Sequence, residues 1–466
     1  MMFSAARIAH RSGAASTYAF SATIVARALL YVTVALAVVR TPIDTATLAI
    51  AAFSAHTVVA GHGVPVVFGP ESAAAGSLQG GVGWLGALAV TVAAATRLHL
   101  FIATIAVIIL TLGLVEMRAR RLSDATLGIA AAAVAALCSR DAVHAGGPLA
   151  APLFVAALFA LLERPTLRRA AAATALTVVW CNVSASGLFG GAFALATALG
   201  MTLDRADVAQ RRASWLAAFG ACLAGLATPA GFAYPLLAFR ALRIDGTLAD
   251  IVRVAPSASA PIGYHLGFML VLVLGLGLGL RGLRFAGAVP ALVTVGLGLA
   301  NGADLPVVGV VVAPLLAAAA HRMRAIVPAG IAFPFALLAA LGTNVAVNDP
   351  RADGGAAILA VRAARLHGVH RLFCAQPRWC AFAVVSGGRV LIDDRFDRAP
   401  APVRDAQLAL VKGRVTWRRV ASRYRIDAIL TGSDSTLGSL VRLAPGWRSF
   451  AVRGDATLFV GRNIRA

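Results

Sequence analysis

The sequence predicts a mainly α-helical protein that crosses a membrane many times and ends in a small soluble α/β domain. Hydrophobic residues make up 59% of the chain and charged residues only 13%, whereas globular domains carry about a quarter charged residues. Apolar stretches of roughly the length that crosses a hydrocarbon core recur through residues 1–345. From about residue 346 onward, polar residues return and helix-like and strand-like patterns alternate.

We expect about eleven spanning helices, because only a helix satisfies its own backbone polar groups in lipid. Their expected ranges are 18–39, 98–115, 124–138, 148–163, 169–182, 185–200, 213–228, 264–280, 285–300, 303–320 and 325–343. Residues 80–96 are also apolar, and we interpret them as a partly inserted or re-entrant segment. One more single span there would move the arginines after the second span to the other side of the membrane.

Arginine clusters in the short loops predict the orientation, because basic residues mark the cytoplasmic side of a membrane protein. With the spans numbered as above, all clusters fall on one side. They are Arg7 and Arg11; Arg118, Arg120 and Arg121; Arg164, Arg168 and Arg169; Arg205, Arg211 and Arg212; Arg281 and Arg284; and Arg322 and Arg324. This predicts a cytoplasmic N-terminus and an extracytoplasmic C-terminal domain. The same placement explains the net charge of +22, so the expected partner is the lipid bilayer and not nucleic acid.

The C-terminal domain, residues 346–466, is long enough to form its own core. Its expected helices are 356–367 and 406–424, and its expected strands are 370–374, 379–386, 389–392, 426–431, 447–452 and 456–461. Cys374 and Cys380 lie close together in this domain. They either form a disulfide in an oxidising compartment or remain two buried thiols, and the sequence leaves both alternatives open.

The external loop 40–79 is the longest polar interruption of the membrane part, and such loops often carry function. It contains Asp44, His56, His62 and Glu71. A carboxylate at this place is suited to act as a general base toward an acceptor hydroxyl, or to hold a divalent metal ion beside a phosphate leaving group. The structural alternative is that Asp44 caps a helix and Glu71 is solvated.

Arg140, Asp141 and His144 follow the third expected span. Ionisable side chains near a membrane are candidate functional residues. Arg140 is suited to bind a phosphate, or alternatively to pair with Asp141.

The densest group of charges in the chain is Asp393, Asp394, Arg395 and Asp397, directly after an expected strand. Loops at such positions often bind ligands in α/β sheets. An arginine between carboxylates also serves simply to hold a loop in place.

A polar turn separates two apolar helices in the membrane part. It reads Trp180-Cys181-Asn182-Val183-Ser184-Ala185-Ser186-Gly187-Leu188-Phe189-Gly190, and its small residues allow close helix packing. The turn resembles the tryptophan-x-asparagine-x-histidine-glycine-glycine motif of bacterial membrane proteins related to the type C glycosyltransferases. Trp180, Asn182 and Gly190 match, whereas Ser184 replaces the histidine. The resemblance makes Trp180 and Asn182 candidate substrate-binding residues.

Further stretches resemble the same family in the same order, so the resemblance extends over nearly the whole chain. They are residues 62–65 (HGVP), 226–231 (LATPAG), 390–397 (VLIDDRFD), 424–430 (YRIDAIL) and 445–447 (PGW). The first loop departs from the family, which has an aspartate and a tryptophan-tryptophan-histidine run where this chain has Ala51 and Phe53.

The resemblance implies a glycosyltransferase of the bacterial cytoplasmic membrane that passes a sugar from a polyprenyl-phosphate donor to an extracytoplasmic acceptor. Asp44, with Glu71 second, would activate the acceptor, and Arg140 would hold the donor phosphate. The loss of two family histidines favours an alternative, a catalytically inactive scaffold or binding protein in envelope glycan assembly. A transporter is the third hypothesis, although internal repeats and ionisable residues in mid-membrane are not evident.

Overall fold

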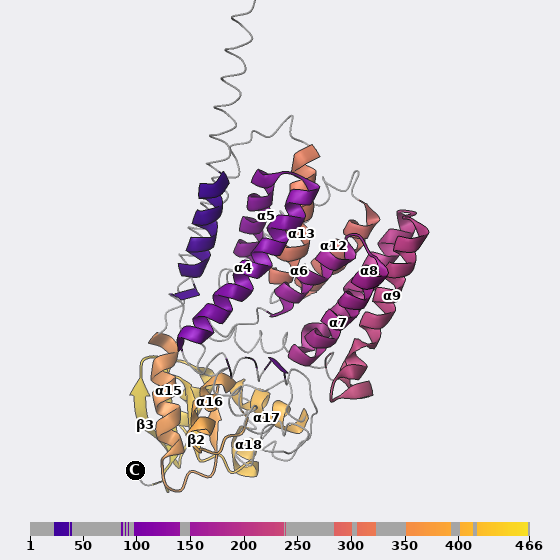
Figure 1. Cartoon of the computed structure of the whole chain (residues 1–466). Helices are drawn as coiled ribbons and strands as arrows, with labels where there is room; N and C mark the ends of the chain where they lie inside the picture. The colour runs from indigo at the N-terminus through magenta and orange to yellow at the C-terminus, as the bar shows by residue number, and fades with distance from the viewer. Residues whose placement is uncertain are drawn as a thin grey trace, which may run out of the picture.

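The computed structural model describes residues 23–36, 38–39, 85–86, 89, 92, 97–139, 150–236, 238, 284–300, 305–322, 351–392, 401–412 and 417–464. They form a helical bundle with a small α/β domain at one end (Figure 1). The bundle contains the helix Thr23–Leu36, α4 (Arg97–Leu122), α5 (Ala125–Cys138), α6 (Ala150–Leu162), α7 (Leu167–Val183), α8 (Leu188–Leu203), α9 (Val208–Leu223), α12 (Phe285–Ala300) and α13 (Leu305–Arg322). Each of the labelled helices overlaps one of the spans expected from the sequence.

Three of the described helices are long and apolar enough to cross a membrane. They are Phe101–Leu122, Ala185–Leu203 and Leu305–Arg322. Helices such as α5 and α6 are apolar but shorter. The membrane class of the chain is therefore supported, whereas the total of about eleven spans stays a prediction. The expected spans 264–280 and 325–343 lie outside the described residues.

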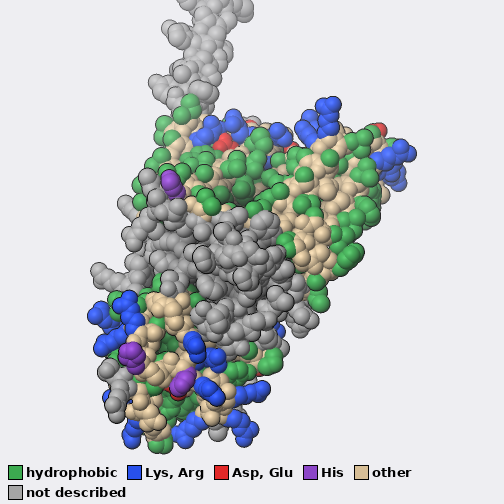
Figure 2. All heavy atoms as spheres, turned by 60° about the horizontal axis from the view of Figure 1, so that its bottom comes forward, with side chains coloured by type: hydrophobic (Ala, Val, Ile, Leu, Met, Phe, Trp, Pro, Cys, Tyr) green, Lys and Arg blue, Asp and Glu red, His purple; other side chains and the backbone are tan. Residues whose placement is uncertain are grey.

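Contacts between loops place the described arginine clusters at one end of the bundle. Glu163, after α6, accepts a hydrogen bond of 3.0 Å from Arg121 at the end of α4. Asp124, before α5, lies 3.5 Å from His321 at the end of α13. Figure 2 shows basic side chains on the end of the bundle that points away from the C-terminal domain. The described arginines therefore share one end of the bundle, whereas the prediction that this end faces the cytoplasm stays a prediction.

Two carboxylates at this end of the bundle cap the N-termini of helices. The backbone N–H groups of Thr126 and Leu127 donate to Asp124 at the N-terminus of α5. Asp204, at the end of α8, accepts hydrogen bonds of 2.7 and 2.9 Å from the N–H groups of Phe285 and Ala286. Such bonds satisfy N–H groups that a helix leaves free in its first turn. Asp204 thereby joins α8 to the start of α12, which lies far away in the sequence.

Small residues allow the helices to approach one another closely. A Cβ atom at Gly200 of α8 would overlap the backbone of Phe285 and Ala286 in α12. A Cβ atom at Gly309 of α13 would lie 2.6 Å from the Cys138 side chain at the end of α5. Of the three long apolar helices, α13 is the most buried: 78% of its apolar segment is buried, against 39% for α4. Close contact between helix surfaces is the main source of stability where lipid removes the hydrophobic driving force.

The C-terminal domain is built on a four-stranded sheet with helices on both faces. The strands are β1 (Leu372–Cys374), β2 (Ala428–Gly432), β3 (Trp447–Arg453) and β4 (Ala456–Gly461), in the order β1-β2-β4-β3. Strands β1 and β2 are parallel, and the β2–β4 and β3–β4 pairs are antiparallel. The helices are α15 (Arg351–Ala364), α16 (Pro377–Val385), α17 (Ala401–Val411), α18 (Trp417–Arg423) and α19 (Thr436–Arg442).

Alternating side chains of the strands form two cores. Phe373, Ile429 and Phe459 pack with residues of α17, α18 and α19 on one face. Their chain neighbours Leu372, Leu430 and Leu458 pack with residues of α15 and α16 on the other. Successive residues of a strand point to opposite faces, so each buried strand carries apolar residues in both directions. The expected small α/β domain agrees with this architecture.

The sequence prediction of a strand at 379–386 is wrong, because this segment is helix α16. Pro377 occupies the first turn of the helix, where its missing N–H group costs nothing. The helix lies on the sheet and buries Cys380 and Ala383 in the core beside α15. An apolar run buried on several sides carries no periodicity that separates a strand from a short helix.

The expected long helix 406–424 and the expected strand 389–392 also differ from the structure. Two helices, α17 and α18, occupy the helical range. Val390 pairs with Leu372 only through an isolated parallel bridge. The closing strand pair, in contrast, is confirmed by the antiparallel strands β3 and β4.

Cys374 and Cys380 form a disulfide, with their Cα atoms 5.6 Å apart. The bond joins the end of β1 to α16. Of the two alternatives that the sequence left open, the structure therefore has the disulfide. The spacing of the Cα atoms lies within the range of ordinary protein disulfides.

We expect Gly200→Ala to destabilise the bundle by about 1–3 kcal/mol, because the added methyl group would overlap the backbone of α12. Gly296→Ala in α12 is the matched control, since a Cβ atom there would meet no atom within 4 Å, and it should gain up to about 1 kcal/mol of helix propensity. Thermal unfolding in detergent measures both. Equal midpoints for the two variants would contradict the close approach of α8 and α12.

Candidate binding groove in the C-terminal domain

A polar groove of about 590 Å³ opens where β1, β2 and β3 begin. Its lining comes from the residue before β1, from α18 and the turn after it, and from the segment that leads into β3. The lining residues are His370, Trp417, Arg418, Ala421, Ser422, Arg425, Ile426, Asp427, Pro445 and Trp447. In Figure 1, α18 lies at the end of the domain away from the helical bundle, so this groove faces away from the bundle.

Two tryptophans provide an aromatic wall. The rings of Trp417 and Trp447 lie 6.1 Å apart between centroids and meet edge to face. Trp417 is only 4% exposed and belongs to the core under α18, whereas Trp447 is partly exposed. The buried ring therefore holds the exposed ring in one orientation, because edge-to-face aromatic pairs have a preferred geometry.

His370 and Asp427 form a polar pair beside the aromatic wall. Asp427 Oδ2 lies 2.8 Å from His370 Nδ1 and also accepts a hydrogen bond of 2.9 Å from the backbone N–H of His370. The His370 side chain remains 63% exposed. The contact with Asp427 orients the imidazole ring, and its other nitrogen is available to a ligand.

Arginines make the groove electropositive. Arg418 and Arg425 line it, and Arg371 lies next to His370, where its Nη1 donates a 2.8 Å hydrogen bond to the Tyr424 carbonyl. Burial lowers the pKa of Arg371 from its ordinary value, and the positive charges of Arg389 and Arg425 lower it further. Arginine nevertheless stays charged at neutral pH. The like charges of Arg371, Arg389 and Arg425 repel one another, and an anion nearby would reduce this repulsion.

Arg425 adopts a left-handed backbone conformation, with φ of 51°. This conformation is unfavourable for a residue with a Cβ atom and costs of order 1–3 kcal/mol. Its backbone N–H donates a 3.2 Å hydrogen bond to the Ser422 carbonyl within the turn between α18 and β2. A glycine would fit the turn better, yet an arginine stands there and its side chain is exposed at the groove.

The groove combines the features that bind a charged sugar. The C–H face of a sugar ring packs on an exposed aromatic ring, and hydroxyls bond to polar side chains at its edges. Guanidinium groups bind carboxylate, phosphate or sulfate groups. Among the described residues, no group of three or more His, Cys, Asp and Glu side chains is placed to hold a metal ion.

The Trp180 turn is a closely packed helix hairpin. Trp180 is completely buried, stacks on Phe154 at 5.6 Å and donates a 3.0 Å hydrogen bond to the Ser186 hydroxyl. The Asn182 side chain donates to the carbonyls of Val178 and Ala227. These contacts position the hairpin itself. A role of Trp180 and Asn182 in substrate binding stays a prediction.

Tyr234 also packs against the turn between α7 and α8. Its hydroxyl donates to the carbonyls of Ser184 and Ala185, and its ring is 1% exposed. Tyr234 also packs close to Gly187, where a Cβ atom would lie 2.8 Å from the hydroxyl. The described Gly86, from the segment expected to be re-entrant, lies against the Val183 carbonyl.

The other residues singled out in the sequence lie outside the described residues. They are Asp44, His56, His62 and Glu71 of the first loop; Arg140, Asp141 and His144; and Asp393, Asp394, Arg395 and Asp397. Their proposed roles, and a divalent metal ion beside the first loop, stay predictions.

Groove residues such as His370 and Trp417 did not stand out in the sequence, because they are far apart along the chain and each is an ordinary residue in its own segment. Two stretches in which the sequence resembles proteins related to type C glycosyltransferases, 424–430 and 445–447, do border the groove. Their residues meet only when the sheet forms.

Neither the known protein-family models nor the curated protein sequences contain a match to this chain. The resemblance to proteins related to type C glycosyltransferases therefore stays an expectation from short motifs.

Proposed function

We propose that this chain is a multi-pass protein of the bacterial cytoplasmic membrane whose C-terminal domain lies outside the cytoplasm and binds an anionic glycan of the cell envelope. The observation that carries the proposal is the groove in which a partly exposed tryptophan, a histidine–aspartate pair and two arginines converge. Its direction, away from the bundle, suits a ligand outside the bilayer and not a lipid within it.

Two observations support the extracytoplasmic position of the groove. The described arginine clusters lie at the end of the bundle opposite the C-terminal domain, and such clusters mark the cytoplasmic side. The domain also contains the Cys374–Cys380 disulfide, a bond that persists in oxidising compartments and is rare in the cytosol.

The orientation predicts the behaviour of reporters fused after Ala466. Alkaline phosphatase, which needs disulfides, should be active there, and green fluorescent protein exported in unfolded form should be dark. The same reporters fused in the loop between α8 and α9, after Ala206, are the control and should behave in the opposite way. A fluorescent fusion at Ala466 with inactive phosphatase would place the groove in the cytoplasm and contradict the proposal.

The groove predicts selective binding of acidic sugars by the full chain in detergent. Titration calorimetry with oligogalacturonate, a polymer of a carboxylated sugar, should show binding that uncharged maltooligosaccharides of equal length do not. Trp447→Ala should weaken binding about ten- to a hundredfold, as loss of an aromatic anchor does. Arg425→Gly should weaken it about tenfold through loss of a charged contact while it fits the left-handed backbone.

Arg453→Ala is the control for that titration, because it removes another exposed arginine at the far end of β3. Its affinity should equal that of the parent chain. An oligonucleotide of equal charge that binds as tightly as the acidic sugar, or Trp447→Ala and Arg425→Gly variants with parental affinity, would show that the groove does not recognise glycans.

Glycosyl transfer is the second candidate function, and the direction of the first described helix favours it. Arg27 pairs with Glu116 near the arginine-rich end, so the helix Thr23–Leu36 runs from there toward the end that carries the C-terminal domain. A site in the following loop would then face the same compartment as the groove.

Transfer of radiolabelled sugar from a polyprenyl phosphate should disappear in Asp44→Ala and Glu71→Ala proteins. Undiminished transfer in both would exclude these residues as the base.

A further inference from the structure

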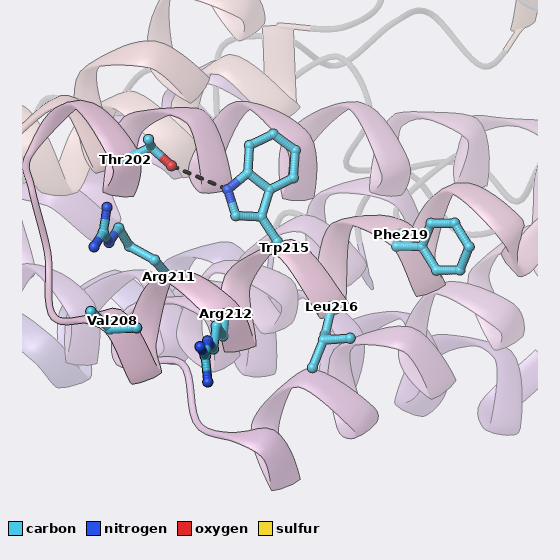
Figure 3. A pocket seen from close by; sticks show the side chains of 7 residues that line it. All are labelled: Thr202, Val208, Arg211, Arg212, Trp215, Leu216 and Phe219. Atoms are coloured by element: carbon cyan, nitrogen blue, oxygen red, sulfur yellow. Dashed lines mark hydrogen bonds between the residues drawn. The ribbon is translucent and has the colours of Figure 1, made fainter.

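A second hollow, of about 630 Å³, lies on the outer face of the bundle along α9. Figure 3 shows Arg211 and Arg212 at one end of it, Trp215 in the middle, and Leu216 and Phe219 beyond. We call it the α9 groove. Its arginines belong to the arginine-rich end of the bundle, so its charged end lies where the cytoplasmic leaflet of a membrane would have its headgroups.

The spacing of these residues places them on one face of the helix. Positions 211 and 212, 215 and 216, and 219 are separated by three or four residues, which is the helical repeat. Phe219 lies about 12 Å along the helix from Arg211, at 1.5 Å per residue. The exposed fractions of Trp215, Leu216 and Phe219 are 41%, 54% and 67%. The groove therefore passes from charged to apolar over roughly two fifths of the thickness of a hydrocarbon core.

The charged end has an unsatisfied donor. Arg211 Nε is buried and has no hydrogen-bond partner within the described structure. The two carboxylates of the adjoining loop already accept backbone N–H groups: Asp204 from Phe285 and Ala286, and Asp207 from Ala209. A phosphate oxygen next to Arg211 and Arg212 would supply the acceptor and the negative charge that this end of the groove needs.

Trp215 connects the charged and apolar parts of the groove. Its indole Nε1 donates a 3.1 Å hydrogen bond to the Thr202 hydroxyl of α8, which holds the ring against the neighbouring helix (Figure 3). A tryptophan between basic and apolar side chains is typical of the membrane interface, where the ring spans the headgroup and acyl regions.

We propose that the α9 groove binds an anionic phospholipid of the cytoplasmic leaflet. The lipid phosphate lies between Arg211 and Arg212, the glycerol region packs on Trp215, and one acyl chain follows Leu216 and Phe219. Electrostatic attraction favours anionic over zwitterionic lipids at such basic sites. The site is separate from the glycan-binding groove and does not depend on it.

Charge favours a lipid over a second copy of the chain. Copies in one membrane share an orientation, so their arginine-rich ends lie at the same depth and repel each other. Arg205 of the loop before α9 adds its charge to those of Arg211 and Arg212 in the helix. Its carboxylates, Asp204 and Asp207, are engaged by backbone N–H groups of their own chain.

Fluorescence quenching of the full chain in lipid nanodiscs tests the proposal. The discs contain unlabelled phosphatidylcholine with rising fractions of phosphatidylglycerol brominated on its acyl chains, and the Trp215→Phe protein supplies the background of the other tryptophans. We expect the Trp215 signal to be quenched at a roughly tenfold lower fraction of brominated phosphatidylglycerol than of brominated phosphatidylcholine, as charge-assisted hydrogen bonds of about 1.4 kcal/mol would give.

The double variant Arg211→Ala and Arg212→Ala should abolish that preference. Its matched control is Arg168→Ala with Arg169→Ala, an arginine pair in the first turn of α7, and this control should keep the preference. Equal quenching by both lipids, or loss of preference in the control, would overturn the proposal. Competition by inorganic phosphate would indicate an ion site, and arginine-dependent dimers in mass photometry would indicate a second copy; either result would also overturn it.

Discussion

The structure depends on one constraint: charged and polar groups next to hydrocarbon need hydrogen-bonding or ionic partners. Glu116, whose side chain is 6% exposed, meets this constraint by accepting hydrogen bonds from Arg27 at 2.8 Å and from the Tyr31 hydroxyl at 3.0 Å. Asp204 meets it by capping α12. Each contact joins segments that are distant in sequence, so the need for partners determines which helix ends lie together.

These contacts gather the described helix ends, and they support the proposed orientation of the chain. The described arginine clusters share one end of the bundle, and the C-terminal domain lies at the other. The disulfide in that domain is consistent with this assignment. The two grooves consequently lie at opposite ends of the molecule, one beside the arginine-rich end of α9 and the other beyond the far end of the bundle.

The candidate sites were harder to predict than the helices. The Trp180 turn stands out in the sequence because its polar residues interrupt apolar helices, yet its side chains bond mainly to their own hairpin. The groove of the C-terminal domain gives no such local signal. Trp417 and Trp447 are separated by a helix and a strand, and they meet because α18 and the start of β3 lie at the same end of one sheet.

The sequence by itself determined the approximate positions of the described helices, the common end of the described arginines and a composition that suits a membrane protein, because hydropathy and charge are local properties of the chain. It also determined the closing strand pair, β3 and β4, whose strands are neighbours along the chain, and the structure shows that they are antiparallel. Only the tertiary structure decided that residues 377–385 form a helix, that Cys374 and Cys380 are bonded, and that His370 lies against Asp427. Those outcomes depend on packing between segments distant in sequence, which no local pattern records.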